Sequence, residues 1–180
     1  MSKIYNFSAG PAVLDSTVLE ATSKAAIDYQ GHGISLMEMS HRSKPVMDMV
    51  AETENLVRVL LQVPDQYYVL FLQGGASLQF AMIPMNLLGE NQTADYTDTG
   101  AWSAKAIKEA QLYGNVNVAC SSKESVHNHI PKELNQSEDA VYLHVTSNNT
   151  IYGTQWYSYP KPINADGYLV ADMSSDIFSR

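Results

Sequence analysis

The stretch FLQGGASLQF, residues Phe71–Phe80, joins an apolar run to a helical pattern through two glycines and two small residues. The run that leads into it, YYVLFL (67–72), is typical of a buried strand. Glycine is required where φ is positive or where another group approaches the backbone closely, and the free N–H groups at a helix start suit an anion. The stretch therefore predicts a strand and a helix joined by a turn that can seat a phosphate.

This turn alone leaves a second interpretation open, because a strand followed by Gly-Gly and a helix can be no more than a tight connection. The sequence GGAS also lacks the lysine of a P-loop and the spacing of GxGxxG. It specifies neither a nucleoside triphosphate nor a dinucleotide. The rest of the chain has to decide between a binding turn and a plain one.

Composition limits the class of protein. With 180 residues, 45% of them apolar, the chain is long enough for one sizeable domain with a core. A formal charge of −8 and scattered basic residues argue against a nucleic-acid partner. No apolar run approaches the roughly 18 residues of a membrane span, and the single Cys120 permits no intrachain disulfide. We expect a soluble, cytoplasmic protein without an export signal.

Periodicity predicts alternating strands and helices. One helix begins near Thr17 and stops before Gly31, and a second begins after Ser43 and ends before Pro64. Further helices are predicted at 76–88 and 102–113, with strands at 67–72, 93–98, 116–120, 140–145 and 168–172. The polar stretch 121–138 is predicted to be a loop, and no linker is evident. This alternation favours an α/β fold with a mainly parallel, doubly wound sheet.

Ligands of parallel sheets bind beyond the carboxyl ends of the strands. There the sequence places Gly75-Ala76-Ser77, Trp102, Thr150 and Asp172. A flat, phosphorylated heteroaromatic cation would use each of them: helix N–H groups for its phosphate, an aromatic ring to stack on, a hydroxyl, and a carboxylate for a protonated ring nitrogen. That description fits pyridoxal 5′-phosphate. Singly, each residue can also be structural, with Trp102 as a core anchor and Thr150 or Asp172 as a cap.

Six segments in order carry a resemblance to a known family. They are NFSAGPAVL (6–14), MEMSHRSK (37–44), FLQGGASLQFAMIPMNLL (71–88), TGAWSAKAIKEA (99–110), TSNNTIYGTQW (146–156) and VADMSSDIFSR (170–180). Together they resemble the phosphoserine aminotransferases, pyridoxal-phosphate enzymes of fold type I within the class V aminotransferases. The resemblance covers essentially the whole chain and the N-terminal portion of the family.

The resemblance implies a three-layer α/β/α fold. Residues 1–180 would comprise an N-terminal segment and most of the large cofactor-binding domain, without the C-terminal small domain. It also implies roles for residues: Gly75, Ala76 and Ser77 seat the cofactor phosphate, Trp102 stacks on the pyridine, Thr150 contacts ring substituents and Asp172 binds the ring nitrogen. His41 and Arg42 would bind the acidic substrate, and this loop would reach the active site of a second subunit in a homodimer.

The implied reaction is a ping-pong transamination. L-glutamate would give its amino group to the cofactor, which would pass it to 3-phosphonooxypyruvate, a phosphorylated 2-oxo acid, to form O-phospho-L-serine. The implied pathways are serine and pyridoxine biosynthesis.

Two departures from the family qualify this expectation. Some members have GGGR where this chain has GGAS, so the phosphate seat would depend more on backbone N–H groups and hydroxyls. The family's Schiff-base lysine lies downstream of the segment that matches 170–180, and none of the eight lysines of this chain matches it. The sequence therefore predicts an inactive chain by itself, and a complementary C-terminal half as a possible partner.

Other functions stay open at this point. Other fold type I aminotransferases and the cysteine desulfurases have the same stacking ring and the same carboxylate at their cofactor. A non-catalytic fragment that only binds its complementary half belongs to a different class. Metal catalysis is the weakest alternative, because His127 and His129 lie in a polar loop without a third ligand and are interpreted as surface histidines.

Overall fold

The computed structural model of the protein describes residues 4–179. The chain divides into two compact units, Met1–Phe71 and Leu72–Arg180, called here the N-terminal and the C-terminal unit. The boundary falls inside the apolar run 67–72, where the sequence shows no linker. Each unit is described by itself.

The N-terminal unit is helical. It contains α1 (Ser16–Ile27), the short 3-10 helix η1 (Leu36–Glu38) and α2 (Lys44–Leu61), which confirms both predicted helices. The carboxylate of Asp15 caps α1 by accepting a 2.8 Å hydrogen bond from the N–H of Thr17. On α2, the side chains of Glu54 and Arg58 form an ion pair, with 2.9 Å between Nη2 of Arg58 and Oε1 of Glu54.

The strand predicted at 67–72 is wrong, because this segment has no regular secondary structure. Within the described residues no strand pairs with it, and a strand needs a partner for its backbone N–H and C=O groups. Its apolar side chains are also largely exposed, with Tyr68 at 89% and Leu70 at 69%. The apolar pattern alone does not supply the hydrogen bonds that make a strand.

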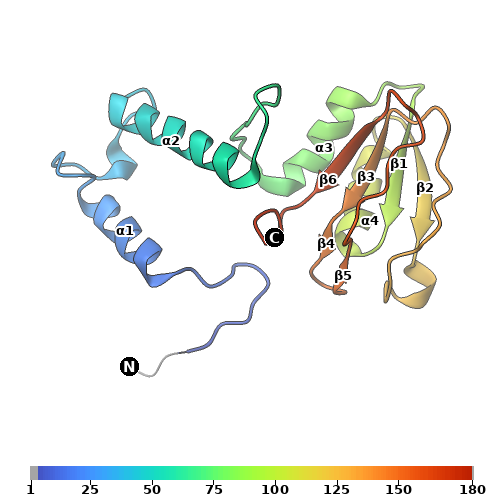
Figure 1. The fold of residues 1–180 in the computed structure, drawn as a ribbon, viewed down its shortest axis with the longest axis horizontal. Helices are drawn as coiled ribbons and strands as arrows, with labels where there is room; N and C mark the ends of the chain where they lie inside the picture. The colour runs from blue at the N-terminus through green and yellow to red at the C-terminus, as the bar shows by residue number, and fades with distance from the viewer. Residues whose placement is uncertain (1–3, 180) are drawn as a thin grey trace. The chain divides into compact units, whose positions relative to one another are not determined.

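The C-terminal unit carries the sheet. Its elements are α3 (Gly75–Leu87), β1 (Thr93–Asp98), α4 (Ala101–Ala110), β2 (Asn115–Ser121), η2 (Lys123–Ser125), β3 (Tyr142–Thr146), β4 (Asn148–Asn149), β5 (Thr154–Gln155) and β6 (Tyr168–Asp172). Four strands lie side by side in the order β2-β1-β3-β6 (Figure 1), and every neighbouring pair is parallel. The predicted α/β fold with a mainly parallel sheet is confirmed. The antiparallel hairpin of β4 and β5 was not predicted.

Helices α3 and α4 pack on one face of this sheet. Phe80 of α3 and Ala106 of α4 join Tyr96 and Tyr142, which alternate onto the same face of β1 and β3, in one buried cluster. The hydroxyls of the two tyrosines share a 2.7 Å hydrogen bond, so that neither polar group is left unpaired in the core.

The polar stretch 122–138 lies against the opposite face. Leu134 packs on Leu143 and Val145 of β3, and the fully buried Asp95 accepts hydrogen bonds from Asn117 (2.7 Å) and from the backbone of Ser137 (3.0 Å). The charge of Asp95 is thus met by N–H donors, which is the condition for burying a carboxylate. Within residues 4–179, no helix has both the length and the apolarity needed to cross a bilayer.

Candidate active site

The six residues predicted to bind a cofactor all lie in the C-terminal unit. Gly75, Ala76 and Ser77 form the first turn of α3, Trp102 is in the first turn of α4, Thr150 directly follows β4, and Asp172 ends β6. Each lies at a helix start or at or just after the carboxyl end of a strand, where the sheet topology puts ligand-binding groups.

The first turn of α3 is built on glycine. Gly74 is the N-cap residue with φ +89°, and a Cβ there would approach Cδ2 of Leu78 to 2.3 Å, so a larger residue is excluded by both backbone and space. Gly75 also has a positive φ, +60°, but a Cβ there would meet no atom within 4 Å. The open space beside Gly75 leaves the first N–H groups of α3 accessible to an anion.

A cavity of about 370 Å³ lies between Ala76 of this turn and Asp172, and Gly75 and Ser77 are not among its lining residues. Ala76 and Gln79 of α3 line one side, and Asp172 and Ser174 line another. The Oδ1 atom of Asp172 accepts hydrogen bonds from the N–H (3.1 Å) and the hydroxyl (2.5 Å) of Ser174. The described residues give Oδ2 no hydrogen bond, which leaves that oxygen for a ligand. The volume is within the roughly 300–1,000 Å³ typical of small-molecule pockets.

Trp102 and Thr150 form a second part of the site. The indole N–H of Trp102 donates a 3.0 Å hydrogen bond to Oγ1 of Thr150, which fixes the orientation of the indole plane. The ammonium of Lys105 lies 4.2 Å from the centre of that ring, a cation–π contact. Lys105 therefore occupies one face of the indole, and only the other face can stack on a flat ligand.

Short hydrogen bonds connect these two parts along the carboxyl edge of the sheet. The backbone N–H of Ser147 donates to the carbonyl of Asp172 (2.9 Å), and the side chain of Asn148 donates to Ser175 (3.0 Å). The residues before Thr150 are in this way attached to the end of β6. Of the predicted substrate residues, His41 and Arg42 lie in an exposed turn of the N-terminal unit, where the N–H of Arg42 bonds Oγ of Ser40.

Sequence reasoning missed a residue of this cavity. His144 of β3 lines it together with Asp172 and is only 1% exposed. Burial lowers the pKa of His144 to about 4, against a smaller opposite effect of the Asp172 charge. The signal in the sequence was a histidine inside the apolar strand AVYLHV (140–145), because burying a polar side chain without a partner is unfavourable.

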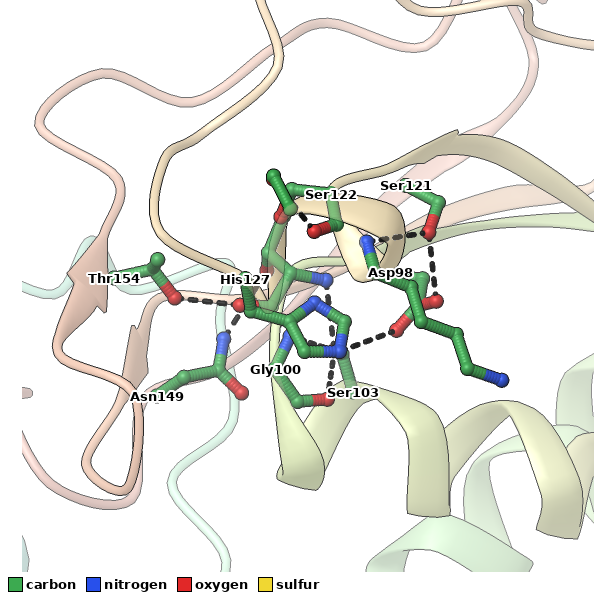
Figure 2. A network of polar contacts seen from close by, with 11 residues as sticks. Asp98, Gly100, Ser103, Ser121, Ser122, His127, Asn149 and Thr154 are labelled. Carbon is green, nitrogen blue, oxygen red and sulfur yellow. Dashed lines mark hydrogen bonds and ion pairs between the residues drawn. The ribbon is translucent and has the colours of Figure 1, made fainter.

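The interpretation of His127 as a surface histidine is wrong. His127 is only 6% exposed, and its Nε2 lies 3.9 Å from Oδ1 of the buried Asp98. Figure 2 shows the two side chains pointing toward one another. The chain reverses at η2, where Val126 and His127 adopt positive φ and the N–H of His127 donates to the carbonyl of Ser122. This reversal turns the imidazole inward, and no spacing in the sequence encodes it. His129 is exposed, as predicted.

The same network surrounds the start of α4 (Figure 2). Oγ of Ser103 accepts hydrogen bonds from the N–H groups of Thr99 (3.0 Å) and Gly100 (2.9 Å), and Thr154 donates to the carbonyl of Thr99 (2.5 Å). These bonds satisfy the helix start from which Trp102 projects. Within residues 4–179 no three His, Cys, Asp or Glu side chains are grouped closely enough to hold a metal ion.

Comparison with known proteins identifies the class. The family model described as "Aminotransferase class-V" matches residues 4–180, and the chain belongs to this family.

Individual relatives are more specific. The chain is 54% identical over 180 residues to a protein of Desulfotalea psychrophila named phosphoserine aminotransferase, covering 99% of this chain and 49% of the relative. It is 50% identical over 182 residues to a protein of the same name from Halalkalibacterium halodurans, covering 100% of this chain and 50% of the relative. The chain thus spans about half the length of these curated relatives.

Solved structures agree with the sequence relatives. A phosphoserine aminotransferase from Bacillus circulans subsp. alkalophilus superimposes with a TM-score of 0.92 at 49% identity, over 99% of this chain and 49% of that one. A phosphoserine aminotransferase from Trichomonas vaginalis, described as bound to PLP, superimposes with a TM-score of 0.89 at 36% identity, over 99% of this chain and 50% of that one. At these identities the likeness extends beyond the bare fold.

Proposed function

We propose that this chain is part of a phosphoserine aminotransferase. The whole enzyme transfers the amino group of L-glutamate to 3-phosphonooxypyruvate, a step of serine biosynthesis, and uses pyridoxal 5′-phosphate. The observation that carries the proposal is the cavity that joins the first turn of α3 to the carboxylate of Asp172. The names of the relatives support the same assignment.

The residues of the site match the chemical groups of the cofactor. The N–H groups of Gly75, Ala76 and Ser77 bind the phosphate, because a helix start attracts anions. Asp172 pairs with the protonated ring nitrogen through Oδ2. When bound, the cofactor supplies an electron sink for the carbanion at the α-carbon of the amino acid, and the negative charge of Asp172 keeps the ring nitrogen protonated.

Trp102 and Thr150 orient the ring. Trp102 stacks through the face that Lys105 leaves free, and Thr150 contacts a polar ring substituent, because its hydroxyl still has a proton to donate after accepting from the indole. Stacking excludes water from one face of the ring, which strengthens the charge pairing at Asp172.

Further parts of the site come from outside the C-terminal unit. Arg42 binds the carboxylate or phosphate of the substrates with its planar fork, and His41 assists. This loop serves the active site of a second subunit in a homodimer. The amine that links the cofactor covalently would come from a complementary C-terminal half, which this chain does not cover in its relatives. Cytoplasmic location and a role in pyridoxine biosynthesis belong to the same proposal.

The first test is denaturing mass spectrometry after incubation with pyridoxal phosphate and borohydride. The purified chain is treated alone and after co-expression with the C-terminal half of the Desulfotalea psychrophila relative. We expect the mass of the reduced cofactor on the C-terminal half and none on this chain. A specific adduct on this chain would overturn the assignment of the lysine, and no adduct on either polypeptide would overturn the proposed function.

The co-expressed pair also separates the related enzyme classes. Transamination of O-phosphoserine with 2-oxoglutarate should exceed that of alanine, and sulfur release from cysteine should be absent. The Trp102→Phe variant should bind the cofactor less tightly, whereas Trp156→Phe, which removes the other tryptophan of the chain, serves as the matched control. Preference for alanine or cysteine would move the protein to another branch of the family.

A further inference from the structure

His144 has two ring nitrogens and no partner for either. Both Nδ1 and Nε2 are buried and make no hydrogen bond within the described residues, and the residue is 1% exposed. Leaving a buried polar group unpaired destabilises a protein by more than a typical hydrogen bond contributes, so native structures seldom tolerate it. A histidine in this position therefore indicates a group that enters the cavity or a carboxylate that turns toward it.

The imidazole is held in one plane. Its ring stacks on that of Tyr96 at 4.7 Å between centroids and an interplanar angle of 19°. Tyr96 is itself fixed, because its hydroxyl bonds that of Tyr142 at 2.7 Å. The edges of the imidazole, which carry the nitrogens, consequently keep their direction in the core.

Asp172 is the charged group that faces this ring. In the pairing of β3 with β6, Val170 is opposite His144 and Asp172 is opposite Thr146. Residues two apart on a strand share a face, so Asp172 lies on the same face of the sheet as His144, one same-face position further along the two strands. Both line the same cavity, and the charge of Asp172 acts on the imidazole.

We propose that His144 is a positioning residue, which donates a ring N–H to Oδ2 of Asp172 and holds that carboxylate toward the ring nitrogen of a bound cofactor. The inference rests on the proposed function. Ser174 fixes Oδ1 in the same way, so the two donors together determine the plane of the carboxylate. Because burial lowers the pKa of His144 to about 4, the imidazole is neutral at pH 7. It adds a donor without adding a positive charge that would oppose the protonated ring nitrogen.

The test compares two ligands that differ at one atom. Dissociation constants of pyridoxal phosphate and of its 1-deaza analogue, in which C–H replaces the ring nitrogen, are measured by equilibrium dialysis with the full chain. The variants are His144→Phe, which keeps a flat ring against Tyr96, and His144→Gln, which keeps an N–H donor. His129→Gln removes an exposed imidazole as the control.

A positioning role predicts ligand-selective effects. His144→Phe should weaken pyridoxal phosphate binding about tenfold, the size expected for one charge-assisted hydrogen bond, and should leave the deaza analogue unchanged. His144→Gln should recover part of the loss. If His144→Phe weakens both ligands equally, the residue is only structural and the inference is overturned. If the unmodified chain binds neither ligand, the proposed cofactor site fails, and the contact between His144 and Asp172 is judged by the cofactor-free measurement that follows.

A cofactor-free measurement separates these two failures. The ¹⁵N signals of the imidazole of His144 are recorded for the chain without ligand and for two variants. Asp172→Asn should shift them, whereas Asp98→Asn, which alters the carboxylate beside His127, should not. Unchanged His144 signals in Asp172→Asn would overturn the contact between the two side chains independently of any cofactor.

Discussion

Two buried histidines, His127 and His144, lie in the C-terminal unit, each near a different carboxylate. The Nε2 atom of His127 is 3.9 Å from the carboxylate of Asp98, which also accepts a 2.8 Å hydrogen bond from Ser121. The two ring nitrogens of His144 make no hydrogen bond within residues 4–179, and the side chain lines the cavity of Asp172. The contact between His127 and Asp98 attaches the segment that follows β2 to the end of β1. The second histidine is open to a ligand site.

The surroundings of His127 and His144 suggest different roles for the two buried side chains. His127 ends a chain reversal and packs against Tyr152 at 4.9 Å between rings, so its contacts stabilise the connection between two elements. His144 stacks on a tyrosine, and both of its ring nitrogens are without a hydrogen bond, whereas in His127 this holds for the buried Nδ1. A buried donor without a partner is costly, and its position in a cavity beside a carboxylate is what distinguishes a functional group from a packing one.

The pH dependence of stability should give the largest contrast. Burial lowers the pKa of His144 from 6.5 to about 4 in the folded protein. Because the folded pKa is the lower one, its stabilising contribution is fully present above pH 6.5 and is lost as the pH falls toward 4. The slope for one such group is about 1.4 kcal/mol per pH unit.

Urea unfolding between pH 7 and 4 measures this contribution. His144→Phe should remove the slope due to His144, so the free energies of unfolding of the variant and the unmodified chain should converge or cross in acid. The charge of Asp172 raises the pKa of His144. Asp172→Asn should therefore lower this pKa further and increase the loss of unfolding free energy in acid. Parallel curves for His144→Phe and the unmodified chain would contradict the burial argument.

The two carboxylates should differ in what they bind. Asp172→Asn removes the charge that we propose to pair with the ring nitrogen, and we expect pyridoxal phosphate to bind about 10- to 100-fold more weakly, as for a lost hydrogen bond to a charged group. Asp98→Asn should instead lower the stability of the chain with little change in affinity, because Asp98 contacts Ser121 and His127. Equal losses of affinity in both variants would contradict the assignment of Asp172, and not Asp98, to the ligand site.

A larger residue at Gly100, at the start of α4, should destabilise the chain. At Gly100 the backbone is extended, with φ 168°, so any residue can adopt it, but a Cβ would approach Cγ of the buried Asn149 to 2.3 Å. Gly100→Ala should destabilise the chain by about 1–3 kcal/mol through overpacking. Gly31→Ala provides a contrast, because φ is +79° there and no atom lies within 4 Å of the added Cβ, so only backbone strain is introduced. Thermal unfolding of both variants distinguishes the two causes.

The apolar periodicity of the sequence predicted most helices and strands of the C-terminal unit, because this pattern can be recognised along each segment by itself. The strand at 93–98 has the predicted bounds, and the helices at α3 and α4 begin within one residue of their predicted starts. The apolar run 67–72 failed because strand formation depends on a partner, which the run itself does not reveal. Its exposed side chains, such as Phe71 at 55%, show that apolar composition alone does not decide between strand and coil.

The candidate site was predictable to the extent that it follows the strand ends. Ala76 and Asp172 share a cavity, and Trp102 bonds Thr150, as their positions after strands suggested. His144 was missed because it points from the middle of a strand, two residues before the end of β3, and only the register with β6 brings it beside Asp172. Such contacts require the pairing of strands far apart in the sequence.

The smallest expected effect concerns the pair that orients the indole. Thr150→Val keeps the shape of the side chain but removes the oxygen that accepts the 3.0 Å hydrogen bond from Trp102. We expect a loss of about 1 kcal/mol in stability or cofactor binding, the net worth of one neutral hydrogen bond. Thr150→Ser retains the hydroxyl and should keep most of it. In the double variant with Trp102→Phe, the substitution Thr150→Val should cost less than it does alone, because the two residues interact. Full additivity in this cycle would mean that the hydrogen bond does not orient the ring.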